Sequence, residues 1–237
     1  MKILALETSA KAVSVAVAED GAILRSRFEG GGQTHSVTMM PMLDEMLHAA
    51  ALTLDDMGAV AVSHGPGSFT GLRIGVSAAK GLAWAKGIPC CGVSTLEAMA
   101  ENGRDFEGLV IGAMDARRNQ IYNALFLCRG GKIERLTPDR AIGLAELLTE
   151  IKNYPEAKLV VGDGAELCYN YLSENGIPCQ ILPGDAGLQN AEGVAKVACT
   201  MAAREQLVPP QQLNPVYLRL SQAERERLAK GLPITLE

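Results

Sequence analysis

Histidine, cysteine and activated serine are the residues most often used for metal binding and nucleophilic catalysis, and their spacing in this chain forms neither kind of site. The three histidines are His35, His48 and His64, and no two of them lie one helical turn apart. The cysteines include no Cys-x-x-Cys pair, and no serine occupies a Gly-x-Ser-x-Gly turn. We therefore predict no metal site and no catalytic residue of these types. His64, which ends an apolar strand, is the best single candidate for chemistry, and the alternative that we favour is a hydrogen-bonded structural histidine.

Acidic and small polar residues follow three predicted strands, at residues 2–6, 109–114 and 159–161, and they are the remaining candidates for ligand binding. If the strands belong to two halves that face each other, these turns line the cleft between the halves, where a nucleotide would bind. The alternative is that they are ordinary solvated turns. The candidate residues are Glu7, Thr8, Ser9, Asp115, Gly162, Asp163 and Gly164.

Two adjacent arginines, Arg117 and Arg118, follow Asp115 in the second of these turns. Guanidinium groups bind phosphate in a bidentate manner, so the pair could hold an anion or an RNA phosphate. The alternative is again a solvated turn.

A glycine-rich stretch, residues 64–75, joins a buried strand to a long helix that ends near Lys86. It lacks the Lys-Ser/Thr of a phosphate-binding P-loop and the third glycine of a dinucleotide-binding turn. Gly71 and Gly75 lie one helical turn apart, and each costs the helix about 1 kcal/mol relative to alanine. Such a helix needs a second backbone close by, which is either its own sheet or a partner's helix. The residues assigned to a partner are Gly71, Gly75, Ala78 and Ala79.

The helix predicted at residues 36–51 carries two apolar stripes, although a helix that lies on a sheet needs only one. Met39, Met42 and Met46 form one stripe, and the other contains Val37, Met40, Leu43, Leu47 and Ala50. Methionine suits adaptable interfaces, so we assign the methionine stripe to a partner protein. The alternative is a helix buried more deeply in its own domain.

The elements that position these residues repeat along the chain. The predicted order is three strands, helix, strand, helix, strand, helix, and it occurs twice, in residues 1–103 and 104–206, before a tail at 207–237. Strands joined by helices form parallel sheets. The sequence therefore predicts an α/β fold of two repeated RNase H-like halves, as in the actin-like, Hsp70 and sugar-kinase ATPase superfamily.

Composition narrows the functional classes. The chain has 237 residues, a net charge of -5 and no apolar run long enough to span a bilayer, which argues against a broad nucleic-acid-binding surface and against a membrane span. The six cysteines lie in apolar surroundings as expected of reduced thiols, and residues 1–2 lead into a short strand and not a signal peptide. We expect a cytoplasmic protein.

Four motifs resemble those of the TsaB (YeaZ) family. They are His-Gly-Pro-Gly-Ser-Phe-Thr-Gly-Leu-Arg-Ile-Gly at 64–75, Asp-Ala-Arg-Arg-Asn-Gln-Ile-Tyr at 115–122, Leu-Ala-Leu-Glu-Thr-Ser at 4–9 and Pro-Val-Tyr-Leu-Arg at 215–219. Position 7 departs from the family pattern, which usually has aspartate there. The likeness spans nearly the whole chain, and the first two motifs are specific.

The resemblance implies a non-catalytic platform in the formation of N6-threonylcarbamoyladenosine (t6A) at adenosine 37 of tRNA. Members of the family pair with the catalytic subunit TsaD through their N-terminal helices, form homodimers through the same surface, and work with the ATPase TsaE. Contact with tRNA would be indirect, through the complex. TsaD binds its metal with a His-x-x-x-His pair, whereas residues 94–99 here contain no histidine.

The resemblance also bears on cofactors. Gly162-Asp163-Gly164-Ala165 is similar to a shortened adenosine-binding turn of TsaD, so we expect no intrinsic cofactor, with ATP or ADP bound weakly or shared with the partner complex. The alternative is a weak ATPase that uses Glu7 and Asp163. A metallopeptidase is disfavoured because the metal ligands are missing.

Overall fold

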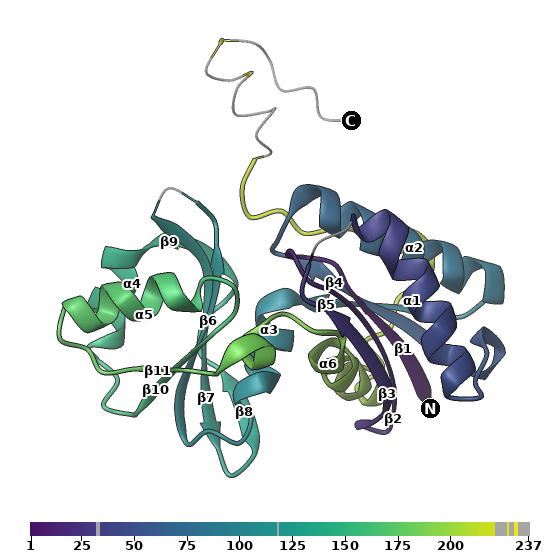
Figure 1. Cartoon of the computed structure of the whole chain (residues 1–237), viewed down its shortest axis with the longest axis horizontal. Helices are drawn as coiled ribbons and strands as arrows, with labels where there is room; N and C mark the ends of the chain where they lie inside the picture. Colours follow the sequence, from purple (N-terminus) through teal and green to yellow (C-terminus); the bar gives the residue numbers. More distant parts are fainter. Residues whose placement is uncertain (32–33, 118, 221–226, 228–229, 232–237) are drawn as a thin grey trace.

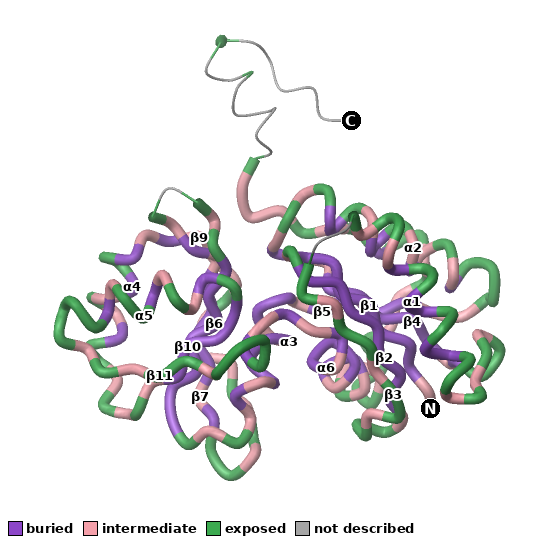
Figure 2. The backbone as a smooth tube through the Cα atoms, viewed as in Figure 1, coloured by how far each residue is buried: buried purple, intermediate pink, exposed green. Residues whose placement is uncertain are grey.

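Two β-sheets lie side by side in the structure, a computed structural model that describes residues 1–31, 34–117, 119–220, 227 and 230–231. Helices cover both sheets, and α3 and α6 lie in the middle of the molecule (Figure 1). The central strands are buried on both faces (Figure 2), which explains their continuous apolar sequences. None of the helices in the described ranges is long and apolar enough to cross a bilayer.

The first sheet has the strand order β3-β2-β1-β4-β5. Strands β1, β2 and β3 form consecutive antiparallel hairpins, whereas β4 runs parallel to β1 and β5 parallel to β4. The strands are β1 (Lys2–Glu7), β2 (Val13–Glu19), β3 (Ala22–Glu29), β4 (Ala59–Gly65) and β5 (Cys90–Ser94).

The second sheet repeats this order as β8-β7-β6-β10-β11, which confirms the predicted duplication. An additional strand, β9 (Arg140–Gly143), pairs with β7, so the helix expected from residue 141 begins only after it. The other strands are β6 (Gly108–Asp115), β7 (Gln120–Arg129), β8 (Lys132–Arg135), β10 (Lys158–Val161) and β11 (Gln180–Ile181).

The described residues also form six α-helices and four short 3₁₀ helices. The α-helices are α1 (His35–Ala49), α2 (Phe69–Lys86), α3 (Thr95–Ala100), α4 (Leu144–Ile151), α5 (Ala165–Glu174) and α6 (Ala191–Ala203). The 3₁₀ helices are η1 (Leu54–Asp56), η2 (Glu101–Gly103), η3 (Gly184–Gly187) and η4 (Pro210–Gln212). Helices α1 and α2 share one core with the first sheet, and α4 and α5 share one with the second.

The helices α3 and α6 are exchanged between the halves. Val194 and Ala198 of α6 pack against Ile3 and Ala16 of the first sheet, although α6 comes from the second repeat. In turn, α3 packs its apolar side chains against β6 and β7. The division predicted at residues 103 and 206 therefore differs from the structure in these two helices, because each buries its apolar face on the other half's sheet.

The described part of the predicted tail packs along the first half up to Tyr217, and Arg219 contacts the second half. Val208 and Cys90 exchange two backbone hydrogen bonds of 2.8 and 2.9 Å, which adds the tail to the edge of β5. Leu213 is buried in the core beneath α2. All six cysteines are free thiols, and four of them are fully buried.

Candidate functional site

The turn after β1 is a sealed polar network and not the wall of an open cleft. Glu7, Thr8 and Ser9 are fully buried. The Glu7 carboxylate accepts hydrogen bonds from the Ser9 backbone N–H, at 2.5 Å, and from the hydroxyl of Ser63 on β4. Burial raises the pKa of Glu7, although these two hydrogen bonds act in the opposite direction. We predicted that this turn either faces a cleft or is solvated. The buried arrangement fits neither prediction.

The glycine-rich stretch is the layer that seals this turn. The Ser68 N–H donates to the carbonyl of Ser9 at 2.7 Å, and the Thr8 hydroxyl donates to the carbonyl of Gly71 at 2.8 Å. A Cβ atom built on Gly67 would lie 2.5 Å from the Ser9 carbonyl oxygen. Only glycine allows the two backbones to approach this closely. Ser68 also caps α2, since its hydroxyl accepts the N–H of Gly71, as expected for a helix start.

The same approach explains the two glycines within α2. A Cβ on Gly71 would lie less than 3.0 Å from the carbonyl oxygen of Thr8, and a Cβ on Gly75 less than 3.0 Å from the Thr8 hydroxyl. Both glycines are buried, Ala79 is fully buried and Ala78 is half-buried. The second backbone that this helix needs is therefore the chain's own β1 turn. The assignment of Gly71, Gly75 and Ala79 to a partner was wrong, because none of them reaches the surface.

The corresponding turns of the second half lie together, with Asp115 and Asp163 exposed and Gly162 and Gly164 buried. The Gly164 N–H donates to the carbonyl of Ala113 at 3.1 Å, beside the end of β6 where Asp115 is exposed. The Asp163 carboxylate accepts a hydrogen bond of 2.7 Å from the buried Gln189 side chain. Desolvation and the nearby Asp115 raise the pKa of Asp163, whereas the hydrogen bond from Gln189 lowers it. The structure thus joins Asp115 with residues 162–164, while Glu7 belongs to a separate buried network.

This pair of carboxylates has no further acidic, histidine or cysteine neighbour suited to a metal: within the described ranges, no group of three or more such residues is placed to hold one. Arg117 is exposed, and its backbone N–H donates to Asp115 at 2.7 Å. Arg118, the second candidate for an anion contact, lies outside the described residues. Arg219 was missed as a neighbour of this turn, although it donates to the Ala116 carbonyl at 2.6 Å.

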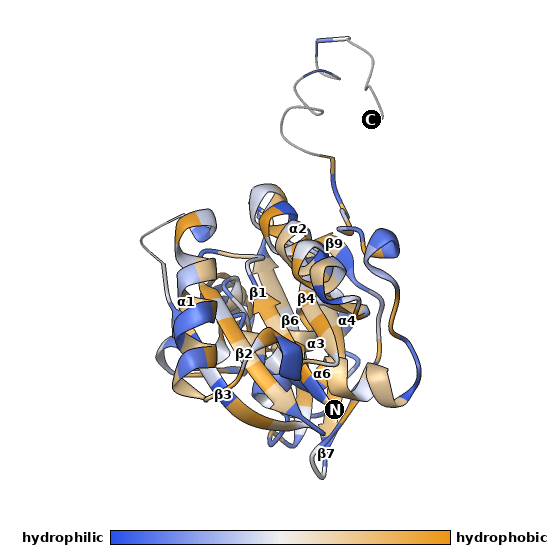
Figure 3. Ribbon diagram, turned by 90° about the vertical axis from the view of Figure 1, so that its right-hand side faces the viewer, coloured by the Kyte–Doolittle hydropathy of each residue, from blue (hydrophilic) through white to orange (hydrophobic). Residues whose placement is uncertain are grey.

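The methionine stripe of α1 faces the core, contrary to the prediction, and the other stripe is divided, because its Leu43 and Leu47 are buried in the same core. Met39, Met42 and Met46 are buried in the first core, and Met46 is 0% exposed. Val37 and Met40, from the other stripe, are 61% and 41% exposed. The assignment of the three methionines to a partner was wrong, because α1 turns them onto sheet strands whose surface is largely hydrophobic (Figure 3).

The outward sides of α1 and α2 form a surface that we call the helix face. It carries the exposed Val37 and Met40 of α1 and, on α2, the half-buried Ile74 and Ala78 together with the exposed polar Thr70, Arg73 and Ser77. At the far end of α2, the Trp84 side chain is 63% exposed. Several exposed apolar side chains on one surface are typical of a protein interface.

Comparison with known proteins gives a consistent family. A family model described as TsaD, tRNA N6-adenosine threonylcarbamoyltransferase, matches residues 29–219. The TsaB proteins of Bacillus subtilis and Escherichia coli, both described as tRNA threonylcarbamoyladenosine biosynthesis proteins, are 33% and 34% identical to this chain. These alignments cover 94% and 92% of the chain, and 96% and 95% of the relatives.

The chain belongs to the TsaB family. A Pseudomonas aeruginosa crystal structure, described as similar to the peptidase YeaZ, superposes with a TM-score of 0.80 at 28% identity, over 92% of this chain and 99% of that one. The component A of (R)-2-hydroxyglutaryl-CoA dehydratase from Acidaminococcus fermentans shares the fold, with a TM-score of 0.52 at 13% identity. The predicted fold class, α/β with two repeated halves, is confirmed.

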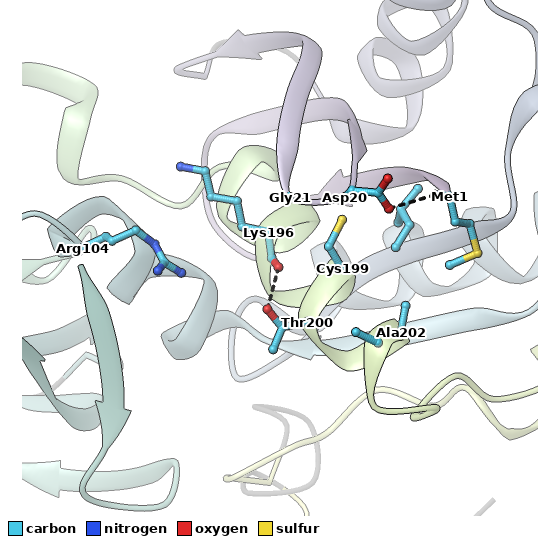
Figure 4. Close-up of a pocket in the computed structure, with 10 residues that line it drawn as sticks. Met1, Asp20, Gly21, Arg104, Lys196, Cys199, Thr200 and Ala202 are labelled. Carbon is cyan, nitrogen blue, oxygen red and sulfur yellow. Dashed lines mark hydrogen bonds and ion pairs between the residues drawn. The ribbon is translucent and has the colours of Figure 1, made fainter. Parts of the chain in front are cut away.

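In this TsaB-family chain, a cavity of about 810 Å³ lies where β1 begins and β2 turns into β3, next to α6 (Figure 4). Its charged groups include the Met1 amino group, paired with Asp20 at 3.0 Å, and Arg104, which donates to both Glu101 carboxylate oxygens and to the Gly131 carbonyl. These ionic groups stabilise the protein's own structure. Lys196 also lines the cavity, and among the described residues it is the one charged lining residue for which the structure gives no ion pair.

Proposed function

We propose that this chain is a non-catalytic scaffold or activator subunit in the formation of N6-threonylcarbamoyladenosine at adenosine 37 of tRNA. In this proposal it pairs with the catalytic subunit TsaD and works with the ATPase TsaE. Its relatives are described as threonylcarbamoyladenosine biosynthesis proteins, and a TsaD family model matches most of the chain.

The observation that carries the proposal is the contrast between the two surfaces described above. The polar turn at Glu7 is closed, so it presents no carboxylate to a substrate. The helix face is open and apolar at Val37 and Met40. A protein that encloses the carboxylate of its first cleft turn and exposes apolar side chains on α1 is suited to binding another protein, because the free energy of association comes from removing apolar surface from water.

The helix face is the surface that we propose for TsaD and, when the chain is alone, for a second copy of itself. Its contact residues are Val37 and Met40, together with the half-buried Ala78, the one residue of the earlier interface set that remains accessible. The tRNA is then held chiefly by the complex. ATP or ADP binds weakly or is shared with the partners, since the β1 turn is sealed.

The test is a reconstitution. The purified chain is mixed with its organism's TsaD and TsaE, with ATP, threonylcarbamoyl-adenylate and tRNA, and both complex mass and modified adenosine are measured. We expect modification only when this chain and TsaD are both present. A Met40→Asp variant should fold normally but lose complex formation and modification, because a charge would be buried at the interface.

Ile181→Asp is the matched control, since Ile181 is a similarly exposed apolar residue, 38% against 41%, on β11 of the second half. It should form the complex as the unchanged chain does. Equal complex formation by both variants would place the interface elsewhere. Saturable ATP turnover by the isolated chain, lost in Glu7→Ala, would contradict the non-catalytic role.

A further inference from the structure

The C-terminal segment at residues 213–219 runs across the end of the first half where β4 stops and α2 begins. The Val216 N–H donates to the carbonyl of His64 at 2.7 Å. A Cβ atom on Gly65 would lie less than 3.0 Å from the Val216 carbonyl oxygen and 3.1 Å from its carbonyl carbon. Gly65 has a φ of +137°, a conformation that side-chain-bearing residues rarely adopt. The segment is therefore fitted onto the glycine-rich stretch and does not merely lie near it.

Aromatic packing holds the same segment to the first turn of α2. The rings of Tyr217 and Phe69 are stacked, with centroids 3.8 Å apart and planes inclined by 4°. Arg73, one helical turn further along, donates from Nε to the Tyr217 hydroxyl at 3.0 Å. Its guanidinium carbon lies 5.2 Å from the Phe69 ring centre, within range of a cation–π interaction.

Two residues later the segment reaches the other half. Arg219 donates from Nη1 to the Ala116 carbonyl at 2.6 Å, in the turn between β6 and β7. Figure 1 shows this segment passing over the space between the two sheets, on the side where β4 and β6 end. The contact joins residues 103 positions apart, and it is a charge-assisted hydrogen bond, the stronger kind.

These contacts form the outermost of three layers over the end of β1. Turn 7–9 is innermost, the glycine-rich stretch covers it through the Ser68–Ser9 and Thr8–Gly71 hydrogen bonds, and residues 213–219 cover that stretch in turn. The His64 ring lies against Gly92 on β5, where a Cβ would come within 2.5 Å of its Nδ1. The backbones of these layers thus approach so closely that there is no room for a Cβ atom, and glycine is required where they meet.

We infer that residues 213–219 form a strap that fastens the two halves across the carboxyl ends of β4 and β6, and that ligand access to the buried turn at Glu7 requires release of the strap. The carboxyl ends of parallel strands are where α/β sheets bind their ligands, because the connecting turns there leave a crevice. In this chain the glycine-rich stretch and the strap fill the crevice over that turn, whereas Asp115 and Asp163 at the ends of β6 and β10 are exposed. The strap is a built-in closing contact, and Arg219 is its attachment to the second half.

Hydrogen–deuterium exchange of the full chain, read by mass spectrometry, tests the strap. In Arg219→Ala, the strap loses its attachment to the second half, so exchange in peptides covering residues 213–219 and 115–117 should become about tenfold faster, as expected for loss of one charge-assisted hydrogen bond. In Tyr217→Ala, which removes the ring stack, exchange in residues 64–71 should accelerate as well. Arg219→Lys, which retains a cationic donor, should recover part of the protection.

Arg129→Ala is the matched control, because Arg129 is an exposed arginine of the second half whose partner is Glu156, far from the strap in sequence and on another turn. It should leave strap exchange unchanged. Unfolding is monitored separately by exchange in β1 and β6, which must stay protected in all variants. Strap peptides that exchange in the unchanged chain as fast as an unstructured peptide, or Arg219→Ala exchange equal to that of Arg129→Ala, would overturn the inference.

Discussion

Replacing glycine by alanine at two positions of the same helix should change stability in opposite directions. Gly81 and Gly71 both lie within α2, but a Cβ on Gly81 meets no atom within 4 Å, whereas one on Gly71 would lie less than 3.0 Å from the Thr8 carbonyl oxygen and 3.2 Å from its carbonyl carbon. Helix propensity favours alanine at both positions by about 1 kcal/mol. Only at Gly71 does a steric cost oppose it.

The steric cost at Gly71 depends on which atoms would have to move to make room for the alanine Cβ. The obstacle at Gly71 is backbone of the buried β1 turn, which cannot rotate aside as a side chain would. Overpacking of this kind costs about 1–3 kcal/mol, and the Thr8–Gly71 hydrogen bond would be strained as well. We expect Gly71→Ala to lower the free energy of unfolding by about 2 kcal/mol, and Gly81→Ala to raise it by about 1 kcal/mol.

Urea denaturation followed by circular dichroism measures both changes, with the midpoint shifting and the slope unchanged if the unfolding remains two-state. In thermal melts a difference of 1 kcal/mol corresponds to about 2–4 °C for a chain of this size. A Gly71→Ala protein as stable as the unchanged chain would refute the reasoning, since it would mean that α2 and the β1 turn are not in contact.

A double-mutant cycle at Gly75 separates steric overlap from other effects. There the obstacle is the Thr8 hydroxyl, a side-chain atom, so Gly75→Ala should be less destabilising in a Thr8→Ala background than alone. Equal effects in the two backgrounds would show that Thr8 is not the obstacle.

Three further outcomes can be checked on the isolated chain. Burial raises the pKa of Glu7, so the folded state binds this proton more tightly than the unfolded state does. The resulting stabilisation is present below the unfolded pKa of about 4.5 and is lost as the pH rises through the folded pKa. Urea titrations at several pH values should show this trend for the unchanged chain and not for Glu7→Gln. Met46→Ala should lower the free energy of unfolding by about 2–5 kcal/mol in the same assay, whereas Met40→Ala should change it by less than about 0.5 kcal/mol, because only Met46 is in the core; equal losses would contradict the assigned faces of α1. A disulfide-exchange reagent should react rapidly with at most the half-buried Cys179 and Cys199, and with the others only after denaturation, because burial raises the pKa of Cys168 to about 12 and shields its thiol; rapid reaction of all six would refute this.

The order of the elements and the duplication could be predicted from the sequence alone. Strands and helices were predictable because β1 and β6 are apolar between their ends and the glycine-rich stretch ends a strand, features that depend on neighbouring residues alone. The repeated strand order followed from repeating the same local pattern. The strand β9 was missed because its stability comes from pairing with β7 and not from its own four residues.

Which helix faces and turns are buried could not be predicted from the sequence and depends on how the elements pack. The two stripes of α1 are about equally apolar, so only the position of the sheet determines that Met46 is inside and Met40 outside. The burial of Glu7 depended in the same way on α2, because the start of that helix places Ser68 and Gly71 on the turn that contains Glu7. The exchange of α3 and α6 and the contact of Arg219 with Ala116 join residues far apart in the chain. Local patterns carry no information on such contacts, because their free energy arises only when the whole chain has packed.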